Sequence, residues 1–267
     1  MYIGIDGTNW IHQLWHAHGG QGVLEAALRR AQALYSEWHP SLMIACFDRR
    51  SFRHDVEPTY KSGRSKRDPA LDALLAAAPV RFAEHEFDVL EPDGKVVKKA
   101  VCMKAEQDGY EADDCLATLA WIGRHHGERV VLASPDKDLR QCLWDKQVGI
   151  LRTFATEGGK VTRPEWFTAA DLRDVYGLKP WQWQDYQALV GDRSDSIVGC
   201  EGWGEKTAAA VLSKVGTLAK CLENPWACPG LSDKKRDALV RFKARAATVL
   251  DLVTLRTSVD AVYDAMR

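Results

Sequence analysis

Acidic side chains are the groups in this chain that are best able to do chemistry. Nine of them lie in short groups along the sequence: Asp6, Asp48, Glu111, Asp113, Asp114, Asp136, Asp138, Asp192 and Asp195. Carboxylates that converge within a few ångströms repel one another or retain protons unless a counter-charge is present. Hard divalent cations with oxygen ligands, Mg²⁺ or Mn²⁺, commonly supply that charge. The sequence therefore predicts a metal-dependent phosphoryl-transfer enzyme.

The segments around these acids predict an α/β fold in which helices flank a mostly parallel sheet. In chain order, the expected elements are strand Tyr2–Ile5, helix Val23–Trp38, strand Leu42–Phe47, helix Glu111–His126, strand Arg129–Ala133 and strand Val148–Leu151. Strands that alternate with helices form a sheet covered on both faces. Asp6, Asp48 and Asp136 each fall at or just after the C-terminal end of a strand, and open α/β sheets bind ligands along that edge.

The rest of the chain predicts a helical C-terminal part and a mixed insertion. Helices are expected at Ala169–Tyr176, Trp181–Val190, Thr207–Val215 and, as one long helix, Lys235–Thr254. We therefore predict a core at residues 1–177 and a helical subdomain at 178–267. Within the core, residues 61–107 predict an insertion with a helix at Asp68–Ala78 and a hairpin at Phe87–Val97, around the turn Glu91-Pro-Asp-Gly94.

Charge is balanced over the whole chain but uneven along it. The net charge is −1, so no global field attracts nucleic acid. Two basic runs, at residues 49–67 and 234–245, accompany the acidic groups. Such a run is often only a solvated surface. An acidic metal site nevertheless needs basic patches nearby when its substrate is a polyanion, and this favours a nucleic-acid substrate.

Cysteine usage and hydropathy limit the class of protein. The seven cysteines are odd in number and include no Cys-x-x-Cys, which argues against a disulfide framework and a zinc site. The apolar start of the chain is too short for a signal peptide, and no apolar run approaches the length of a membrane span. We expect a cytoplasmic protein, in the host cytoplasm if it is phage-encoded, with no membrane partner.

Three acidic motifs occur in a fixed order: Gly-Tyr-Glu-Ala-Asp-Asp at 109–114, Ser-Pro-Asp-Lys-Asp-Leu at 134–139 and Gly-Asp-Arg-Ser-Asp-Ser at 191–196. Tyr60-Lys-Ser-Gly-Arg64 precedes them, and a Gly-rich turn at 199–208 follows. Over nearly the whole chain this pattern resembles the flap endonuclease (5′-nuclease) family. That family includes phage and bacterial 5′–3′ exonucleases and the 5′-nuclease domain of bacterial DNA polymerase I. The resemblance implies a PIN-like core, an arch insertion and a helix–three-turn–helix.

The resemblance also implies two metal sites a few ångströms apart. The first Mg²⁺ would be held by Asp6, Asp48, Glu111 and Asp113, with Asp114 close by, and the second by Asp136, Asp138, Asp192 and Asp195; Mn²⁺ is expected to substitute. Asp6, Asp136, Lys61 and Arg64 are the candidate catalytic residues. Lys61 and Arg64 would contact the scissile phosphate and stabilise charge in the transition state. General phosphate steering without a catalytic role is the alternative for this pair.

Further residues would hold DNA away from the metals. The candidates are Arg53, Tyr60, Lys61, Arg64, Gly202, Gly204, Lys206 and Thr207. Arg53 would be a simple phosphate contact, and Tyr60 would either stack on a displaced base or pack at the base of the arch. The two glycines permit a phosphate to approach the N–H groups of the following helix. By resemblance, K⁺ would be held by the main-chain carbonyls of Leu189, Val190, Val198, Cys200 and Trp203.

The expected function is a structure-specific 5′ nuclease, a monomer that acts on DNA with 5′ ends or 5′ flaps. Lys95, Lys98 and Lys99 would line the return of a partly ordered arch that folds around the threaded strand. The alternatives are a DNA-binding homologue with an inactive site and an RNase H-like activity on RNA/DNA hybrids. A haloacid-dehalogenase-type phosphatase would need Asp-x-Asp after the first strand, where this chain has Asp6-Gly-Thr8.

Overall fold

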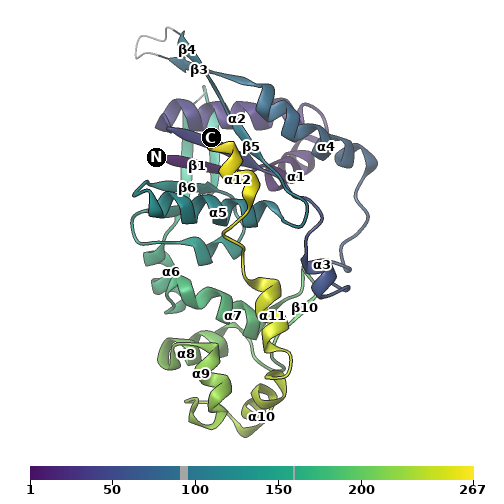
Figure 1. Ribbon diagram of the computed structural model, residues 1–267, viewed down its shortest axis with the longest axis vertical. Helices are drawn as coiled ribbons and strands as arrows, with labels where there is room; N and C mark the ends of the chain where they lie inside the picture. Colours follow the sequence, from purple (N-terminus) through teal and green to yellow (C-terminus); the bar gives the residue numbers. More distant parts are fainter. Residues whose placement is uncertain (91–95, 159) are drawn as a thin grey trace.

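A six-stranded sheet forms the centre of the N-terminal part of the computed structural model, which describes residues 1–90, 96–158 and 160–267 (Figure 1). Its strand order is β5-β2-β1-β6-β7-β8, with bounds β1 Tyr2–Asp6, β2 Leu42–Cys46, β5 Met103–Ala105, β6 Val130–Ala133, β7 Val148–Glu157 and β8 Lys160–Phe167. Neighbouring strands are parallel except β7 and β8, which are antiparallel. The prediction of a mostly parallel sheet is confirmed.

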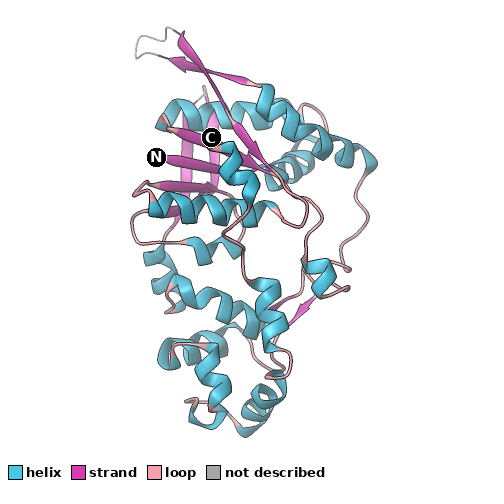
Figure 2. Cartoon of the chain, viewed as in Figure 1, coloured by secondary structure: helices cyan, strands magenta, loops and turns pink. Residues whose placement is uncertain are grey.

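Helices cover both faces of this sheet (Figure 2). The helices α1 (Gly7–His18), α2 (Val23–Trp38) and α4 (Pro69–Glu84) share a buried core with Ile3 and Ile5 of β1, whereas α5 (Ala112–His125) packs on the opposite face. A Cβ on Gly4 would lie 2.6 Å from Leu116 Cδ2, so a larger residue there would push α5 away from β1. Asp6 lies two residues further along the same face. This close packing therefore sets the distance between the end of β1 and the start of α5.

The helix α4 is longer than the sequence predicted. It begins after Asp68, whose carboxylate accepts a hydrogen bond from Ala70 N–H, and it continues through Pro79 to Glu84. The prediction that it ends at Ala78 was wrong. Pro79 and Phe82 are both buried, and this packing outweighs the helical hydrogen bond that proline removes.

The predicted hairpin is present as β3 (Glu86–Leu90) and β4 (Val96–Val101), which pair antiparallel. It projects beyond α2 at the top of Figure 1, far from the short helix α3 (Arg53–Val56). The predicted turn at 91–94 and Lys95 lie outside the described residues, as do the side chains of Lys98 and Lys99. The end of the expected arch is β5, which pairs with β2 as an edge strand of the main sheet.

The C-terminal part consists of short helices joined by tight turns. In chain order these are α6 Ala169–Tyr176, η2 Pro180–Gln182, α7 Trp183–Val190, α8 Glu205–Val215, α9 Leu218–Glu223, η3 Pro225–Ala227, α10 Asp233–Phe242, α11 Ala246–Val253 and α12 Asp260–Ala265. The prediction of one long helix at Lys235–Thr254 was wrong, because the chain breaks between Phe242 and Ala246. The apolar spacing runs through this break, and the separate α11 packs against α7 and α3.

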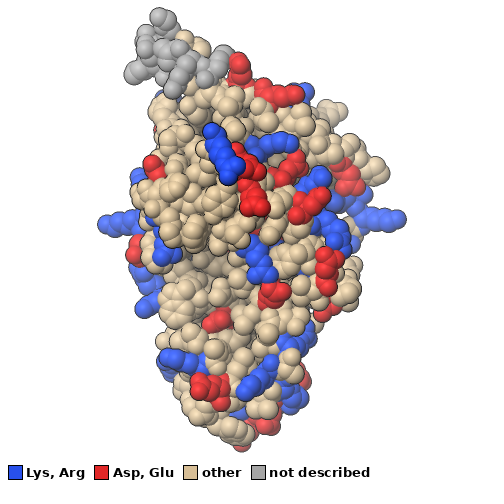
Figure 3. Space-filling model, viewed as in Figure 1, with Lys and Arg blue, Asp and Glu red and all other residues tan. Residues whose placement is uncertain are grey.

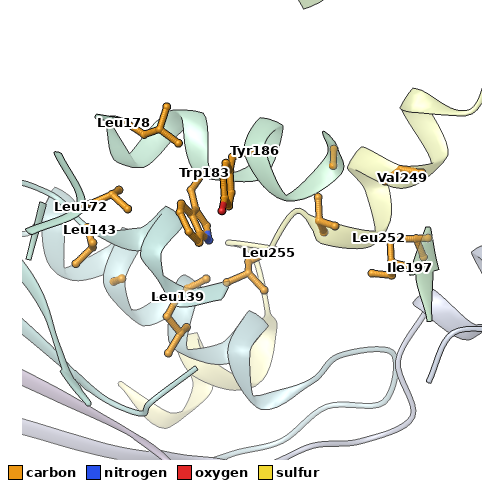
Figure 4. Packing of buried hydrophobic residues seen from close by; sticks show 14 of the residues in the cluster. Leu139, Leu143, Leu172, Leu178, Trp183, Tyr186, Ile197, Val249, Leu252 and Leu255 are labelled. Atoms are coloured by element: carbon orange, nitrogen blue, oxygen red, sulfur yellow. The ribbon is translucent and has the colours of Figure 1, made fainter. Parts of the chain in front are cut away.

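One hydrophobic core continues from the sheet into the helical part. Leu139 of the 3₁₀ helix η1 (Asp138–Cys142), Trp183 of α7 and Leu255 come together in it (Figure 4). Beyond α11 the chain returns to the N-terminal part, where α12 packs against β5 and α5. This shared core fixes the helical acids opposite the sheet edge. Within the described residues, no helix is long and apolar enough to cross a membrane.

Candidate active site

Three strand ends bring Asp6, Asp48 and Asp136 to one edge of the sheet. Asp6 is the last residue of β1 and caps α1, and its Oδ2 accepts a hydrogen bond of 2.6 Å from the Ser134 hydroxyl. Asp48 follows β2, and its Oδ1 accepts the Ala112 N–H at 2.8 Å. Each hydrogen bond fixes one oxygen of the carboxylate. The expectation that these acids gather at the carboxyl edge agrees with their positions.

The helix α5 points its N-terminus at the same edge and adds Asp113. Glu111 is the N-cap of this helix. Asp113 Oδ1 is buried and has no hydrogen-bond partner among the residues that the structure describes. Burial, followed by the charges of Asp136 and Asp6, raises the pKa of Asp113 well above its ordinary value. Buried polar atoms are normally satisfied, so an unpartnered carboxylate oxygen among other carboxylates indicates a cation site.

The remaining acids come from η1, which follows β6, and from the helical part. Asp138 begins η1, Asp192 ends the short strand β9 (Gly191–Asp192), and Asp195 precedes β10 (Ile197–Val198). Gln187 of α7 donates a hydrogen bond of 2.6 Å to Asp138 Oδ1. Lys137 pairs with Asp192 at 2.8 Å. The site is therefore assembled from both parts of the molecule.

Burial and the neighbouring carboxylates raise the pKa of several of these acids. Burial, opposed by the Ser134 hydrogen bond, raises the pKa of Asp6 to about 7, and Asp48 adds to the rise. Burial and the neighbouring Asp136 raise the pKa of Asp138 to about 8. Such shifts are expected where buried carboxylates lie close to one another without a neutralising cation. A cluster of this kind is a typical feature of functional sites.

The donor chemistry fits hard divalent cations, because every candidate ligand is a carboxylate oxygen. In the part of the chain that the structure describes, no three Asp, Glu, His or Cys side chains are already arranged to hold one ion. Cationic side chains lie among the carboxylates instead: Lys61, Arg64 and Lys137. The unpartnered Asp113 oxygen is one ready ligand, and further oxygens would turn toward an ion by rotation about side-chain bonds.

Arg53 and Asp114 form a buried ion pair. This pair contradicts the assignment of Arg53 to DNA binding and of Asp114 to metal binding. Arg53 is 2% exposed and Asp114 is 0% exposed. The guanidinium also donates to the carbonyls of Leu252 and Thr254, and the Asp114 Oδ1 accepts Arg256 N–H. Arg53 therefore cannot contact DNA phosphate, and Asp114 has no free oxygen for a metal ion. The pattern of residue types could not show that this arginine turns inward.

The position of Tyr60 does not allow one of its two expected roles, stacking on a displaced base. It is 4% exposed, and its hydroxyl donates to Glu111 Oε2 at 2.8 Å and lies 3.2 Å from Asp195 Oδ2. A buried ring cannot stack on a displaced base, so the assignment of Tyr60 to DNA binding was wrong. Tyr60 links an acid of the sheet edge to an acid of the helical part.

Lys61 and Arg64 lie at the mouth of this acidic cluster. The Lys61 ammonium pairs with Glu111 Oε1, and Arg64 Nη2 pairs with Asp195 Oδ1 at 2.6 Å. Both line a cleft of about 1260 Å³ that also contains Asp48 and Glu111. Its outer wall is formed by residues 65–80, with Lys66 and Arg67 among them. The two cations are therefore positioned between the acids and the open cleft.

The end of α7 and the turn that joins it to α8 contain the residues predicted to hold potassium: Leu189, Val190, Val198, Cys200 and Trp203. Cys200 N–H donates to the Leu189 carbonyl at 2.8 Å, and Trp203 N–H donates to the Cys200 carbonyl at 3.1 Å. Gly191 and Gly199 approach so closely that any side chain on Gly199 would meet the Leu189 carbonyl. The backbone is therefore folded tightly at this point.

The predicted DNA contacts of the same turn lie on its surface. Gly202, in the left-handed region with φ of 73°, is exposed, as are Gly204 and Lys206. Gly204 is the N-cap of α8 and forms no side-chain cap, so the first N–H groups of that helix have no partner within the helix. The Thr207 hydroxyl accepts a hydrogen bond of 2.6 Å from Lys235 Nζ, which brings the second basic run to the turn.

Several residues of the site were missed by the sequence analysis. Ser134 holds Asp6, Gln187 holds Asp138, and Lys137 neutralises Asp192. Lys137 could have been suspected, because it lies between two of the acids in the sequence. Gln187 carried no local signal, since its partner is 49 residues away. His12 and Trp15 of α1 line the cleft and likewise had no distinguishing spacing.

Models of two protein domains match the chain almost end to end. Residues 2–177 match the N-terminal resolvase-like domain of 5′–3′ exonuclease, and residues 178–266 match the C-terminal SAM fold of 5′–3′ exonuclease. DNA polymerase I of Bacillus subtilis is 33% identical over 220 residues, covering 82% of this chain and 22% of that protein. Thermostable DNA polymerase I of Thermus aquaticus is 33% identical over 229 residues, with 82% and 24% covered. The chain thus spans less than a quarter of these relatives.

Solved structures share the fold over nearly the whole chain. The bacteriophage T5 5′-exonuclease with bound zinc superposes with a TM-score of 0.76 at 21% identity, covering 100% of this chain and 94% of that one. The catalytic core of Rad2 in complex with a DNA substrate gives a TM-score of 0.55 at 14% identity, covering 97% and 80%. The first of these proteins carries divalent metal and the second carries DNA.

Proposed function

Because the chain belongs to the 5′–3′ exonuclease family, we propose that it hydrolyses DNA phosphodiester bonds at 5′ ends and 5′ flaps with two Mg²⁺ ions. The observation that carries this proposal is the buried, unpartnered Asp113 oxygen among Asp6, Asp136 and Asp138. A cluster of raised-pKa carboxylates beside a basic cleft fits a metal-dependent reaction on a polyanion. We further propose Mn²⁺ as a substitute, because the ligands are all hard oxygens.

The acids would divide between two ions according to where they lie. Asp6, Asp48 and Asp113, with Glu111 at the margin, would hold one ion, and Asp136, Asp138, Asp192 and Asp195 would hold the other. When bound, such a pair supplies a water of lowered pKa and charge stabilisation for the leaving 3′ oxygen, so that cleavage leaves a 5′-phosphate. Ser134 and Ala112 keep one oxygen of Asp6 and Asp48 fixed by hydrogen bonds. The protein thus presents these carboxylates in a fixed orientation before substrate arrives.

Lys61 and Arg64 would hold the scissile phosphate. Both cations already lie at the boundary between the acidic cluster and the cleft. A phosphate oxygen that accepts hydrogen bonds from them would replace Glu111 and Asp195 as their partner. Their charge would then neutralise the negative charge that develops on the phosphate during attack. Release of Glu111 from Lys61 would also free an oxygen next to the ion-binding acids.

The duplex part of the substrate would be held by the turn before α8. The uncapped N–H groups at the start of this helix and the exposed Lys206 would bind a phosphate without contact to the bases, so binding would not depend on base sequence. We propose that K⁺ binds the carbonyls of Leu189, Val190, Val198, Cys200 and Trp203, and the tight folding of the backbone around Gly191 and Gly199 supports this proposal. The positive charge of an ion at this turn would offset the negative charge of a bound phosphate.

The unpaired 5′ strand would pass through the cleft under residues 65–80. The cleft connects the acids to a wall that carries Lys66 and Arg67, so the strand would meet cations along its path. We propose that the protein acts as a monomer on DNA, because this single chain supplies acids, cleft and turn.

The proposal is tested by incubating the pure protein with a labelled 5′-flap duplex, a single strand, an RNA/DNA hybrid and a simple phosphate monoester, with and without Mg²⁺. Mg²⁺-dependent cleavage of the flap that Asp113→Asn abolishes would support it. Flap binding without any cleavage would identify an inactive DNA-binding homologue. Preferential cleavage of the hybrid or the monoester would identify an RNase H-like enzyme or a phosphatase instead.

A further inference from the structure

A second depression, of about 450 Å³, lies between α5, the chain after η1 and the segment around η2. None of its lining residues also lines the cleft of about 1260 Å³ beside the acidic cluster, which we call the carboxylate cleft. Three tryptophans on its rim are unusually exposed: Trp121 at 41%, Trp144 at 40% and Trp181 at 48%. We name it the tryptophan pocket after these three residues. Large apolar side chains gathered at one exposed place mark interaction sites rather than ordinary surface.

The floor of the tryptophan pocket is apolar and its rim is basic. Ala117, Ala120 and Leu255 form part of the floor. Arg124, Arg173 and Lys179 lie on the rim against a single acid, Asp145. Within the described residues, none of these three cations forms an ion pair. On the face shown in Figure 3, the surface over α5 is largely uncharged.

We propose that the tryptophan pocket binds a short acidic peptide segment of a partner protein, with one large apolar side chain inserted into the floor. Trp and Arg are the residues that contribute most to binding energy at protein interfaces. A depression of this volume encloses one large side chain and its neighbouring backbone. Aspartate or glutamate on either side of that anchor would pair with the three unpaired cations, and this charge complementarity selects an acidic partner.

Single-stranded DNA is the other polyanion that tryptophan and arginine bind, and the geometry disfavours it. The Arg124 guanidinium lies over the Trp144 ring, and the His125 ring lies 3.9 Å from that of Trp121. Two of the three indoles therefore have one face covered, whereas base stacking requires free faces along a continuous basic path. The separation from the carboxylate cleft also keeps a substrate strand in that cleft away from the pocket.

The test measures the fluorescence anisotropy of labelled peptides with the full chain. The probe is fluorescein-Gly-Ser-Asp-Asp-Phe-Asp-Asp, with analogues that carry Leu or Trp in place of Phe. The control peptides replace the anchor by Gly or all aspartates by Lys, and labelled oligothymidylate reports single-stranded DNA. The variants are Trp181→Ala and Arg173→Glu. The matched control is Trp226→Ala, because Trp226 is 58% exposed and lies beside Arg236 but lines neither of these two cavities.

The proposal predicts binding of at least one anchored acidic peptide in the range of about 1–100 µM. Binding should weaken at least about tenfold with either pocket variant, with the Gly peptide and with the Lys peptide, and should be unchanged by Trp226→Ala. The flap-cleavage rate of Trp181→Ala should equal that of the wild type. No binding of any anchored peptide, or equal weakening by Trp226→Ala, would overturn the proposal. Loss of oligothymidylate binding in Trp181→Ala without peptide binding would assign the pocket to DNA.

Discussion

Arg53 and Asp114 form a two-pronged ion pair beneath the acidic cluster, with Nη1 2.8 Å from Oδ2 and Nη2 2.9 Å from Oδ1. The pair is buried, and Arg53 donates hydrogen bonds to the carbonyls of Leu252, in the last turn of α11, and Thr254, just after it. It therefore joins α3, α5 and the returning C-terminal segment at the base of the candidate site. Its function is to position neighbouring groups, because neither side chain reaches the cleft.

Arg53→Ala should destabilise the protein strongly. Removal of one member of a buried pair leaves an uncompensated charge, which costs about 3–5 kcal/mol of unfolding free energy. Urea denaturation measures this change. Arg50→Ala is the matched control, because the Arg50–Asp55 pair is exposed and its loss should not shift the midpoint measurably. An equal midpoint for Arg53→Ala and wild type would contradict the structural role of the pair.

Asp138→Asn should stabilise the metal-free protein, and more so at higher pH. The pKa of Asp138 is raised to about 8 in the folded chain by burial and by Asp136, from an unperturbed value of 3.8. Between these values the folded chain retains a proton that the unfolded chain releases, so the unfolding free energy falls as the pH rises. Asparagine removes the cost of ionising this buried carboxyl group, and its side-chain oxygen can still accept the hydrogen bond from Gln187.

Melting temperatures measured with a chelator present from pH 5 to pH 8 test this prediction. The advantage of Asp138→Asn over wild type should grow with pH and reach about 3 °C or more at pH 8. Asp174→Asn, on an exposed residue of α6, is the control and should show no such trend. A melting temperature below that of wild type throughout would argue against repulsion within the cluster.

The strands and the gathering of acids at their ends could be predicted from sequence, because both depend on local patterns. Apolar runs define β1, β2 and β6, and the acids directly follow them. The Arg53–Asp114 pair could not be predicted, because its enclosure depends on carbonyls 199 and 201 residues away. The break before Ala246 could not be predicted either, because the apolar spacing continues through it and the contacts of α11 with α7 and α3 are distant in sequence.

Asp6→Asn and Asp136→Asn should each reduce flap cleavage by several orders of magnitude. Both residues are proposed ion ligands, whereas duplex affinity rests on contacts at the turn before α8. Single-turnover cleavage and binding in Ca²⁺ separate the two effects. Cleavage within about tenfold of wild type in either variant would remove that residue from the active site.

Lys61→Ala should mainly lower the maximal rate of cleavage, whereas Lys206→Ala should mainly lower the affinity for the duplex. Lys61 is proposed to act on the scissile phosphate, so its loss should lower the maximal rate more than the affinity. Lys206 is proposed to hold the duplex, so its loss should weaken binding and reduce the salt dependence by about one counterion. The reverse pattern would exchange the two assignments.

Threading under residues 65–80 should make cleavage sensitive to a blocked 5′ end. Streptavidin bound to a 5′-biotinylated flap before the enzyme is added should inhibit cleavage strongly, because the strand must enter by its end. The same block added after the complex has formed should inhibit little. Equal cleavage of blocked and free flaps would indicate an open cleft over which the strand is laid from the side.

The number of Mn²⁺ ions that the metal-free protein binds tests the central claim most directly. The structure leads us to expect two ions per chain in a calorimetric titration, with at least one lost in Asp113→Asn, because Asp113 Oδ1 is a buried carboxylate oxygen that has no partner among the described residues. Retention of both ions by Asp113→Asn, or binding of none by the wild type, would show that these carboxylates do not form the metal site.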